Sequence, residues 1–383
     1  MRDAVIVEAV RTPVGKRNGG LSGVHPVDLS ALVLEAIVER TGLDPALVDD
    51  VIWGCVSQVG EQTFNVGRHA ALSAGWPESV PGTTVDRQCG SSQQAVSFAA
   101  ATVISGQCDL VVAGGVESMS RVPMGSTMPE GAGLPVGERF KERYGEVFPN
   151  QGTGAEMIAE RWALTRMELD AFSLGSHEKA AAAQDGGRFD SQLIPVKTVD
   201  GSVVDADEGV RRGGTVESLA GLKTPFRPEG VITAGNASQI SDGAAALLVT
   251  TSERAAELGL RPLARIHTAV VTGDDPVIML TGPIPATAKA LARSGLGLAD
   301  IGVYEVNEAF APVPLAWLVE TGADPARLNP NGGAIALGHP LGGSGARLMT
   351  TMVHHMRAEG VRYGLQTMCE GGGTANATIL ELL

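Results

Sequence analysis

Two cysteines stand at positions where a thiol could take part in chemistry. Cys89 lies in VDRQCGSSQQAV, between a β-branched run and a run of small residues typical of a helix. At a helix N-terminus the free N–H groups and the helix dipole favour a thiolate and can bind a developing oxyanion. Cys369 lies in QTMCEGGGTA, between a predicted strand and a glycine turn. Each cysteine is either a buried core residue or a reactive thiol, and the local sequence leaves both interpretations open.

A thiol nucleophile needs a base, and His339 is the best placed of the seven histidines. It lies in NPNGGAIALGHPLGGSGAR, where a glycine-rich turn can present an imidazole to a cleft. The alternative is a hydrogen-bonded turn histidine. Cys369 could serve as a second acid and base, since a thiol pKa starts near about 8.5. Surface or structural roles are expected for the other histidines, which are His25, His69, His177, His267, His354 and His355.

VNEAFAPV supplies Asn307 and Glu308. The Asn307 amide could hold a water molecule or donate to an oxyanion, or it could satisfy its own turn. The cysteines and histidines show no CxxC or HxxxH spacing, so no metal site is predicted. GGSGAR lacks the lysine and the spacing of a phosphate-binding loop.

The composition excludes several classes of protein. The chain has 383 residues, a net charge of −14 and no run of Lys and Arg, which argues against binding to nucleic acid or to an anionic membrane surface. We see no signal peptide and no apolar run long enough to span a membrane. Four cysteines in a chain of this length do not form a disulfide framework. We therefore expect a reduced, cytoplasmic protein.

Short β-rich runs alternate with helical stretches, which predicts an α/β fold. AVIVEAV, DVIWGCVSQVG and DLVVAGGVESMS are expected strands, and VDLSALVLEAIVERTG is an expected helix that ends at Gly42. From about residue 120 to 240 the chain is richer in proline and paired glycines and carries amphipathic helices. We expect an N-terminal half at 1–119, an inserted subdomain at 120–240 and a C-terminal half at 241–383, whose first strand completes the N-terminal half.

The two α/β parts have similar sequence patterns. QCGSSQQAVSFAAATV is followed by LVVAGGVESM, and GHPLGGSGARLMTTMV is followed by LQTMCEGGGTANATI. In each part a tight turn opens a small-residue helix, and a strand with glycines at or after its end follows. An internal duplication or chance among glycine-rich segments would explain the pattern.

Together the motifs resemble those of the thiolase family, the acetyl-CoA C-acyltransferases. Four motifs match in order, and the resemblance covers essentially the whole chain. They are Cys-Gly-Ser at 89–91, Asn-Glu-Ala-Phe at 307–310, Gly-His-Pro at 338–340 and Cys-Glu-Gly at 369–371.

The resemblance implies a thiolase fold, with two similar βαβαβαββ halves in five αβαβα layers and an inserted loop domain. By likeness, Cys89 is the acylated nucleophile, and His339 activates it. His339 and a water held by Asn307 would form one oxyanion site, and the N–H groups of Cys89 and Gly371 a second. Cys369 would move the proton to and from the carbon nucleophile or the incoming thiol.

The same resemblance implies coenzyme A and acyl-CoA as substrates and no permanently bound cofactor. ITAGNASQISDGAAALL resembles the pantetheine loop, which makes Ser238 a candidate partner of the pantetheine amides. DEGVRRGGT resembles the segment that surrounds the adenine of coenzyme A, where Arg211 would stack on the adenine. The alternative is that Arg211 is an ordinary surface arginine. A homodimer or homotetramer is expected, with PMGSTMPEGAGLPVG either a tetramer contact or a mobile loop.

The sequence departs from short-chain biosynthetic members of the family. Asn150 and Gln151 stand where those members carry His and Met, and Ser92 replaces a common Gly. These changes allow a bulkier acyl chain, branched or sterol-derived, and the alternative is a short-chain biosynthetic thiolase that forms acetoacetyl-CoA. A ketoacyl synthase is disfavoured by Cys369 and its glycines. A cysteine thioesterase and a non-catalytic CoA-binding paralogue compete with the thiolase interpretation.

Overall fold

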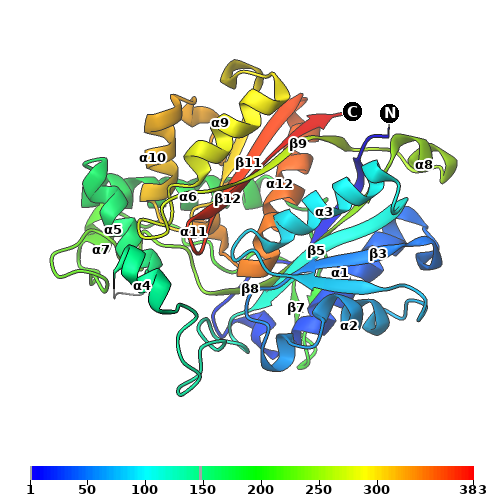
Figure 1. Ribbon diagram of the computed structural model, residues 1–383, viewed down its shortest axis with the longest axis horizontal. Coiled ribbons are helices and arrows are strands. Elements are labelled where there is room, and N and C mark those ends of the chain that lie inside the picture. The colour runs from blue at the N-terminus through cyan, green and yellow to red at the C-terminus, as the bar shows by residue number, and fades with distance from the viewer. Residues whose placement is uncertain (1, 146–148) are drawn as a thin grey trace.

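Two half-sheets join in one mixed sheet at the centre of the molecule (Figure 1). The computed structural model describes residues 2–145 and 149–383, and within these residues the sheet has ten strands. The strand order is β10-β11-β12-β9-β1-β8-β5-β3-β4, and β2 pairs with β8 outside this path. The half-sheets meet where β1 pairs with β9, at Val5 opposite Arg265 and Ile6 opposite Ala264.

The strands of the main sheet are β1 (Val5–Arg11), β2 (Gly15–Lys16), β3 (Asp50–Gly54), β4 (Gly82–Val85), β5 (Leu110–Ser118), β8 (Ser241–Thr250), β9 (Ala264–Gly273), β10 (Val303–Val306), β11 (Tyr363–Glu370) and β12 (Thr374–Leu382). A separate ribbon pairs β6 (Val196–Lys197) with β7 (Val203–Val204).

The α-helices are α1 (Pro26–Thr41), α2 (Val66–Ser73), α3 (Ser91–Ser105), α4 (Glu138–Tyr144), α5 (Gln151–Arg161), α6 (Arg166–Asp185), α7 (Val216–Ala220), α8 (Ser252–Glu257), α9 (Pro283–Ser294), α10 (Pro312–Thr321), α11 (Ala334–Leu337) and α12 (Ser344–Glu359). Short 3-10 helices lie at Gly20–Gly23, Pro45–Leu47, Gly60–Gln62, Leu298–Asp300, Pro325–Arg327 and Leu341–Gly343.

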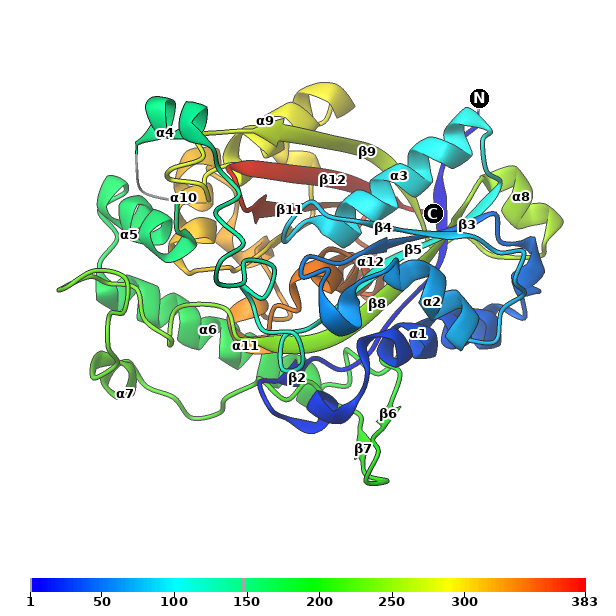
Figure 2. The ribbon, with the colours of Figure 1, turned by 60° about the horizontal axis from the view of Figure 1, so that its bottom comes forward.

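The helices and half-sheets form five layers, which are most easily followed in Figure 2. Helices α1 and α2 cover the outer face of the N-terminal half-sheet. Helices α3 and α12 pack against each other between the two half-sheets and share a core with both. Helices α9 and α10 cover the outer face of the C-terminal half-sheet. Burial of small and branched apolar side chains on both faces of α3 and α12 explains why these helices are so rich in Ala, Val and Met.

The two halves repeat one topology. In the N-terminal half the order β3-β5-β8-β1 has one parallel pair followed by two antiparallel pairs. The order β10-β11-β12-β9 in the C-terminal half has the same pattern. The register repeats too, because Ile52 lies opposite Ala113 and Glu305 lies opposite Gln366. The two segments with similar sequence patterns therefore have the matching topology that an internal duplication would produce.

Helix boundaries follow local capping chemistry. The His25 side chain accepts a hydrogen bond from Val27 N–H at the start of α1, and Gly42 ends the helix in the left-handed conformation. Helices α3 and α12 end in the same way at Gly106 and Gly360. The predicted strand DVIWGCVSQVG stops at Gly54, because the next N–H groups turn away from the ladder toward the carboxylate of Glu117.

The insertion between β5 and β8 carries helices α4 to α7 and packs beside the C-terminal half. Its helix α5 shares a core with α10, with the loop before α9 and with Cys369. In Figure 1 these green helices lie at one end of the molecule. Among the helices of the described residues, none is both long and apolar enough to cross a membrane.

Candidate active site

Cys89 lies in a tight turn two residues before the first residue of α3, Ser91. Gln88 adopts the left-handed conformation at φ 48°, which is uncommon for a residue with a side chain. Ser91 secures the turn, since its hydroxyl donates to Gln88 O at 2.6 Å and accepts from Arg87 N–H at 2.9 Å. Cys89 is buried and packs against Met119, Leu341, Leu348 and Met368. The turn thus fixes the thiol at the N-terminal end of the central helix.

His339 lies at the corresponding end of α12, and its ring is held by hydrogen bonds. Its Nδ1 lies 2.6 Å from Ser344 Oγ, and that hydroxyl donates to Pro340 O at 2.9 Å. Nδ1 must therefore carry the proton, which leaves Nε2 as a hydrogen-bond acceptor. The backbone N–H of His339 donates to Ser241 Oγ at 3.1 Å. Gly338 permits this contact, because its φ is 98° and a Cβ there would lie 2.4 Å from Ser241 Oγ.

Asn307 lies directly after β10 and faces the free nitrogen of His339. Its Nδ2 is 3.4 Å from His339 Nε2, and its buried Oδ1 has no hydrogen-bond partner within the described chain. An amide with a free acceptor beside an imidazole can hold a water molecule.

The neighbouring Glu308 has a structural part. It accepts hydrogen bonds from Ser176, Asn329 and the N–H of Ile335, and so holds α11 just before the Gly-His-Pro turn.

Cys369 and Gly371 flank the end of β11. Cys369 is fully buried in the cluster that joins α5 to α10. A charge at Cys89 raises the pKa of Cys369, which places the two thiols within electrostatic reach of each other. Gly371 lies beside the Cys89 turn, because a Cβ at Gly371 would be 2.9 Å from Gln88 Oε1.

Burial keeps the thiol and the imidazole neutral in the free protein. It raises the pKa of Cys89 to about 12, with a further rise from Glu370, and it raises the pKa of Cys369 above its usual range. Burial and then Arg347 lower the pKa of His339 to about 3. The expected thiolate at the helix N-terminus is therefore not the resting state, since desolvation outweighs the helix dipole. The resting pair is a thiol and a neutral imidazole.

Several residues that hold these loops were not found from the sequence. Glu117, at the end of β5, accepts from the N–H groups of Val56, Ser57 and Gly342, and from the Gln62 amide. It thereby ties the turn before α12 to the N-terminal half. Ser241 and Ser344 orient His339. Ser344 stands within the quoted glycine-rich motif, four residues beyond Pro340, so its spacing offered a signal.

The two predicted CoA-binding residues lie on the insertion side of the site. Ser238 is half-buried, and its N–H donates to Ala309 O at 2.9 Å, next to the Asn-Glu-Ala-Phe turn. Arg211 is exposed and lines a hollow of about 320 Å³ along α6. The Gln239 amide donates to Gly209 O, which connects the two segments. The segments that carry Ser238 and Arg211 are therefore in contact through the neighbours of these residues.

The other histidines make structural contacts. His177 accepts from Arg211 N–H, His354 bridges Ala9 O and Ser191, and His355 lies 3.3 Å from the Asn331 amide. Within the described residues, no three His, Cys, Asp or Glu side chains are grouped so that they could hold a metal ion.

A buried thiol at the start of one central helix and a neutral imidazole at the start of the other are groups that acyl transfer through a thioester uses, which is the chemistry of an acyltransferase. Residues 4–253 match the family model described as thiolase, N-terminal domain, and residues 260–382 match that described as thiolase, C-terminal domain. The chain belongs to the thiolase family. It is an acyltransferase with CoA-dependent thiolase activity.

Relatives of known name support this assignment over the full length. The chain is 53% identical to the steroid 3-ketoacyl-CoA thiolase FadA6 of Mycobacterium tuberculosis, with 100% of this chain and 95% of the relative covered. It is 46% identical to the β-ketoadipyl-CoA thiolase of Escherichia coli, with 100% of both covered. The crystal structure of the acetyl-CoA acetyltransferase of Bacillus anthracis superposes with a TM-score of 0.91 at 38% identity, covering 100% of this chain and 99% of that one. The predicted family and fold class are confirmed.

Proposed function

We propose that the chain exchanges acyl groups between a 3-ketoacyl-CoA and coenzyme A through a thioester on Cys89. The observation that carries this proposal is the tautomer of His339. Its Nδ1–H is committed to Ser344, so Nε2 is available as a base at the end of the central helix pair. Cys89 lies at the same end of that pair, on α3.

In the cleavage direction, Cys89 gives its proton to His339 Nε2 and its sulfur attacks the 3-keto carbon. The C2–C3 bond of the substrate then breaks, and its electron pair goes to C2 as the enolate of acetyl-CoA. The Cys369 thiol donates a proton to that carbon and is left as a thiolate. Each developing oxyanion needs hydrogen-bond donors. The imidazolium and the Asn307 water would donate to the oxygen of the thioester carbonyl, which becomes the enolate oxygen. The N–H groups of Cys89 and Gly371 would donate to the oxygen on the tetrahedral carbon.

The second half-reaction restores every group. The Cys369 thiolate takes the proton from the thiol of coenzyme A, and the coenzyme sulfur attacks the acyl carbon. The bond between that carbon and Cys89 breaks, and the imidazolium returns its proton to Cys89. Because each intermediate is a thioester, neither half-reaction is steeply uphill, and the same steps run backwards in condensation.

Substitution at each cysteine tests these roles separately. Cys89→Ala is expected to abolish acyl transfer in both directions. Cys369→Ala is expected to retain slow acylation of Cys89 by a simple acyl-CoA but to lose thiolysis by about a hundredfold or more, because general acid–base catalysis contributes this much. Thiolysis at the normal rate in Cys369→Ala would contradict the role of Cys369, and transfer by Cys89→Ala would contradict the whole mechanism.

The acyl chain is proposed to be large and apolar, and ring-bearing in the preferred substrate. The relative at 53% identity is named for steroid substrates. Met119 packs against Cys89, and the segment that follows carries Met124, Met128 and Leu134, which are 59%, 44% and 61% exposed. An apolar acyl chain would cover such side chains. The adjacent cation, Arg121, is paired with Glu61, which disfavours a carboxylate-bearing chain.

A panel of substrates tests this specificity. We expect kcat/KM for thiolysis to be higher for ring-bearing 3-ketoacyl-CoA than for acetoacetyl-CoA or 3-oxoadipyl-CoA. Met124→Gln should raise KM for the ring-bearing substrate, whereas Met167→Gln, at an equally exposed methionine of α6, should not. Preference for acetoacetyl-CoA or for the dicarboxylic substrate would overturn the proposed acyl specificity.

Coenzyme A is proposed to bind along the surface that joins Ser238 and Arg211. Ser238 lies next to the Asn307 turn and suits the amides of the pantetheine arm, and the hollow beside Arg211 suits the adenine. Arg211→Ala is expected to raise KM for coenzyme A by several-fold with little change in kcat. A change confined to kcat would contradict this placement.

A second copy of the chain is proposed to pair along β4. This strand ends the sheet, and Phe64, Leu72 and Phe98 are exposed. An open strand edge next to exposed aromatic residues favours association of copies in a dimer or tetramer. Light scattering during size-exclusion chromatography measures this directly, and a monomer at micromolar concentration would contradict it.

A further inference from the structure

Glu370 lies between Cys369 and Gly371, and the mechanism above gives it no part. Its side chain is fully buried. One oxygen, Oε2, accepts from the Thr374 hydroxyl at 2.7 Å. The other, Oε1, has no hydrogen-bond partner within the described chain. A buried carboxyl oxygen without a donor costs free energy, which calls for a functional reason.

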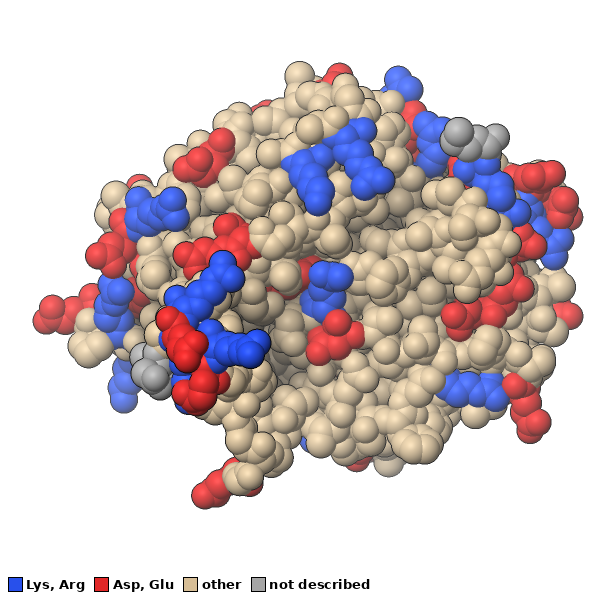
Figure 3. Space-filling view, in the orientation of Figure 1, with Lys and Arg blue, Asp and Glu red and all other residues tan. Residues whose placement is uncertain are grey.

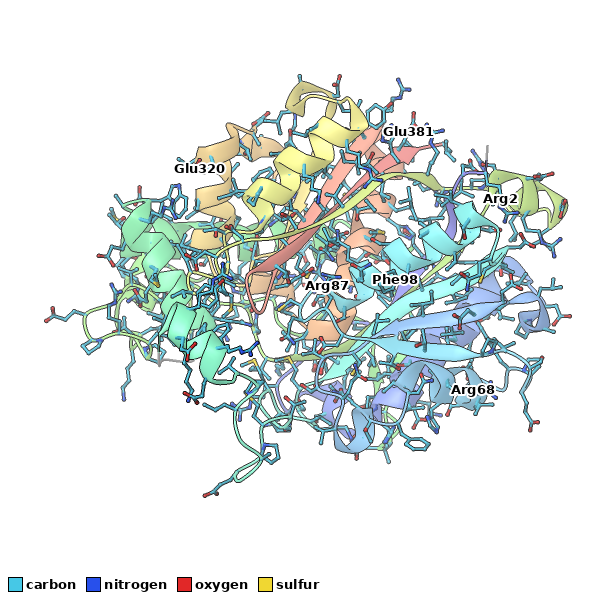
Figure 4. The ribbon with its side chains drawn as sticks, viewed as in Figure 1. Arg2, Arg68, Arg87, Phe98, Glu320 and Glu381 are labelled. Atoms are coloured by element: carbon cyan, nitrogen blue, oxygen red, sulfur yellow. The ribbon has the colours of Figure 1, made fainter. Side chains whose placement is uncertain are left out.

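The unpaired oxygen points to the turn that holds the nucleophile. A Cβ placed on Gly90 would lie only 2.0 Å from Glu370 Oε1, so the carboxyl rests against the residue next to Cys89. Asn376 lies beside it and donates to Gly90 O at 3.2 Å. Figure 4 labels Arg87 in this region, between the turn of β11–β12 and the start of α3. In the same view, Figure 3 shows charged side chains of both signs beside a hollow at the middle of this face.

The internal duplication supplies a counterpart for comparison. Glu117 and Glu370 occupy equivalent positions in the two halves. The spacing from Ser91, the first residue of α3, to Glu117 equals the spacing from Ser344, the first residue of α12, to Glu370. Both glutamates lie near the end of the strand after the central helix. Each reaches across to the start of the other half's central helix, Glu117 to Gly342 and Glu370 to Gly90.

The two counterparts differ in their hydrogen bonds. Glu117 accepts from four donors, including three backbone N–H groups, and this holds loops together. Within the described residues Glu370 has one donor, Thr374, whose hydrogen bond spans the short turn between β11 and β12, and no backbone N–H group donates to its carboxyl. Glu117 therefore has the bonding of a structural carboxylate, and Glu370 does not.

The charged surroundings of Glu370 are mixed. Arg87 and Asp86 face it from the turn before α3, with Cys89 beyond them, and Cys369 is its neighbour on β11. Burial raises the pKa of Glu370 to about 7, while Thr374 and Arg87 oppose that rise. The charged form of Glu370 in turn raises the pKa of both Cys89 and Cys369. The carboxyl and the two thiols thus compete for one negative charge.

We propose that Glu370 is a positioning residue that controls the charge on the two active-site thiols. Its carboxyl is neutral while Cys369 carries the negative charge between the half-reactions, and its ionisation suppresses thiolate formation at Cys89 and Cys369. This inference rests on the proposed function, since it takes the two cysteines as the reacting thiols.

Alkylation of Cys89 by iodoacetamide tests the proposal without substrate. The rate is measured from about pH 6 to about pH 10 by mass spectrometry of the Cys89 peptide, for the wild type and for Glu370→Gln. Glutamine keeps the size and removes the charge, so at about pH 8 we expect alkylation to be about tenfold faster. Thiolysis by this variant should also lose the ionisation near neutral pH from its pH profile.

Two further variants separate charge from packing. Thr374→Val removes a hydrogen bond that favours the charged form of Glu370, so the carboxyl stays neutral to higher pH. We therefore expect alkylation of Cys89 to be faster than in the wild type, but by less than in Glu370→Gln. Glu117→Gln is the matched control at the counterpart position, where we expect a lower Tm and a smaller change in the alkylation profile.

An alkylation profile that is unchanged in Glu370→Gln would overturn the proposal. If that variant does not fold, an unchanged profile in Thr374→Val overturns it instead. Failure of the proposed function has a different signature, which is thiolysis retained by Cys89→Ala whatever the result at Glu370.

Discussion

At the scale of residues, the site depends on how the partners of His339 fix its proton. Because the Ser344 hydroxyl donates its one hydrogen to Pro340 O, it can only accept from His339 Nδ1, and this chain of two hydrogen bonds selects one tautomer of the imidazole. Cys89 and His339 are both buried, and burial favours the neutral form of each side chain. In the proposed mechanism they therefore start as a thiol and an imidazole rather than as an ion pair, and the first step is proton transfer to Nε2.

Ser344→Ala is expected to lower kcat/KM for thiolysis by about tenfold to a hundredfold, because the imidazole loses the acceptor that orients it. Ser191→Ala is the matched control, since Ser191 makes the same kind of contact 2.9 Å from Nδ1 of His354, outside the site. Initial-rate kinetics of the two purified variants measure the difference. Equal effects of the two substitutions would show that Ser344 acts only on stability.

The residues proposed to carry chemistry stand in short motifs of the sequence, whereas the residues that hold their loops do not. Cys89, His339 and Cys369 each stand beside glycines that leave room for a substrate. Glu117 and Ser241 give no such signal, because each acts on a loop more than 90 residues away in the chain. The charge state of Cys89 was also mispredicted, because desolvation depends on tertiary burial that a helix N-terminus does not reveal.

At the scale of elements, the central helices α3 and α12 place the two catalytic ends together. Close approach of their backbones depends on small residues, since a Cβ on Gly345 would lie 2.3 Å from Gln93 N. The sequence predicted both helices as small-residue runs. The predicted strand that begins at Asp50 is too long. Its later N–H groups donate to Glu117, and the sequence gives no sign of this because Glu117 lies on a different strand.

Gly345→Ala is expected to destabilise the protein by about 1–3 kcal/mol or more, since α3 must move away from α12. Gly175→Ala is the matched control within α6, where an added Cβ meets nothing within 4 Å. That substitution should stabilise by about 0.5–1 kcal/mol, because alanine is the better helix former. Urea unfolding of the two variants measures both changes, and a loss of stability in both would contradict the packing argument.

At the scale of the whole molecule, the duplication places each half's strand ends against the other half's central helix. Glu117 and Glu370 are the clearest pair, since Glu117 accepts from three backbone N–H groups and Glu370 leaves Oε1 without a partner within the described chain. The same burial that shapes the site leaves three histidines neutral, and it lowers the pKa of His339 to about 3 and those of His177 and His354 to about 4.

Burial raises the pKa of Glu305 to about 8 and that of Glu370 to about 7, so these two carboxyls favour the folded protein as the pH falls. The three buried histidines act in the opposite direction below about pH 6.5, the ordinary pKa of histidine, because each binds a proton in the unfolded chain and not in the folded one down to about pH 4. Each histidine contributes up to about 1.4 kcal/mol per pH unit. His354→Gln should reduce this slope. Thermal melts of the wild type and of His354→Gln at a series of pH values measure the difference, and the same dependence of Tm on pH in both proteins would contradict a buried neutral His354.

The most direct measurement is mass spectrometry of the Cys89 peptide after the protein is mixed with a ring-bearing 3-ketoacyl-CoA and no free coenzyme A. We predict an acyl group on Cys89 that is two carbons shorter than the acyl chain of the substrate, together with released acetyl-CoA. His339→Ala should form this adduct far more slowly. An unmodified Cys89 in folded protein, with the acyl group absent or on another residue, would contradict the central claim.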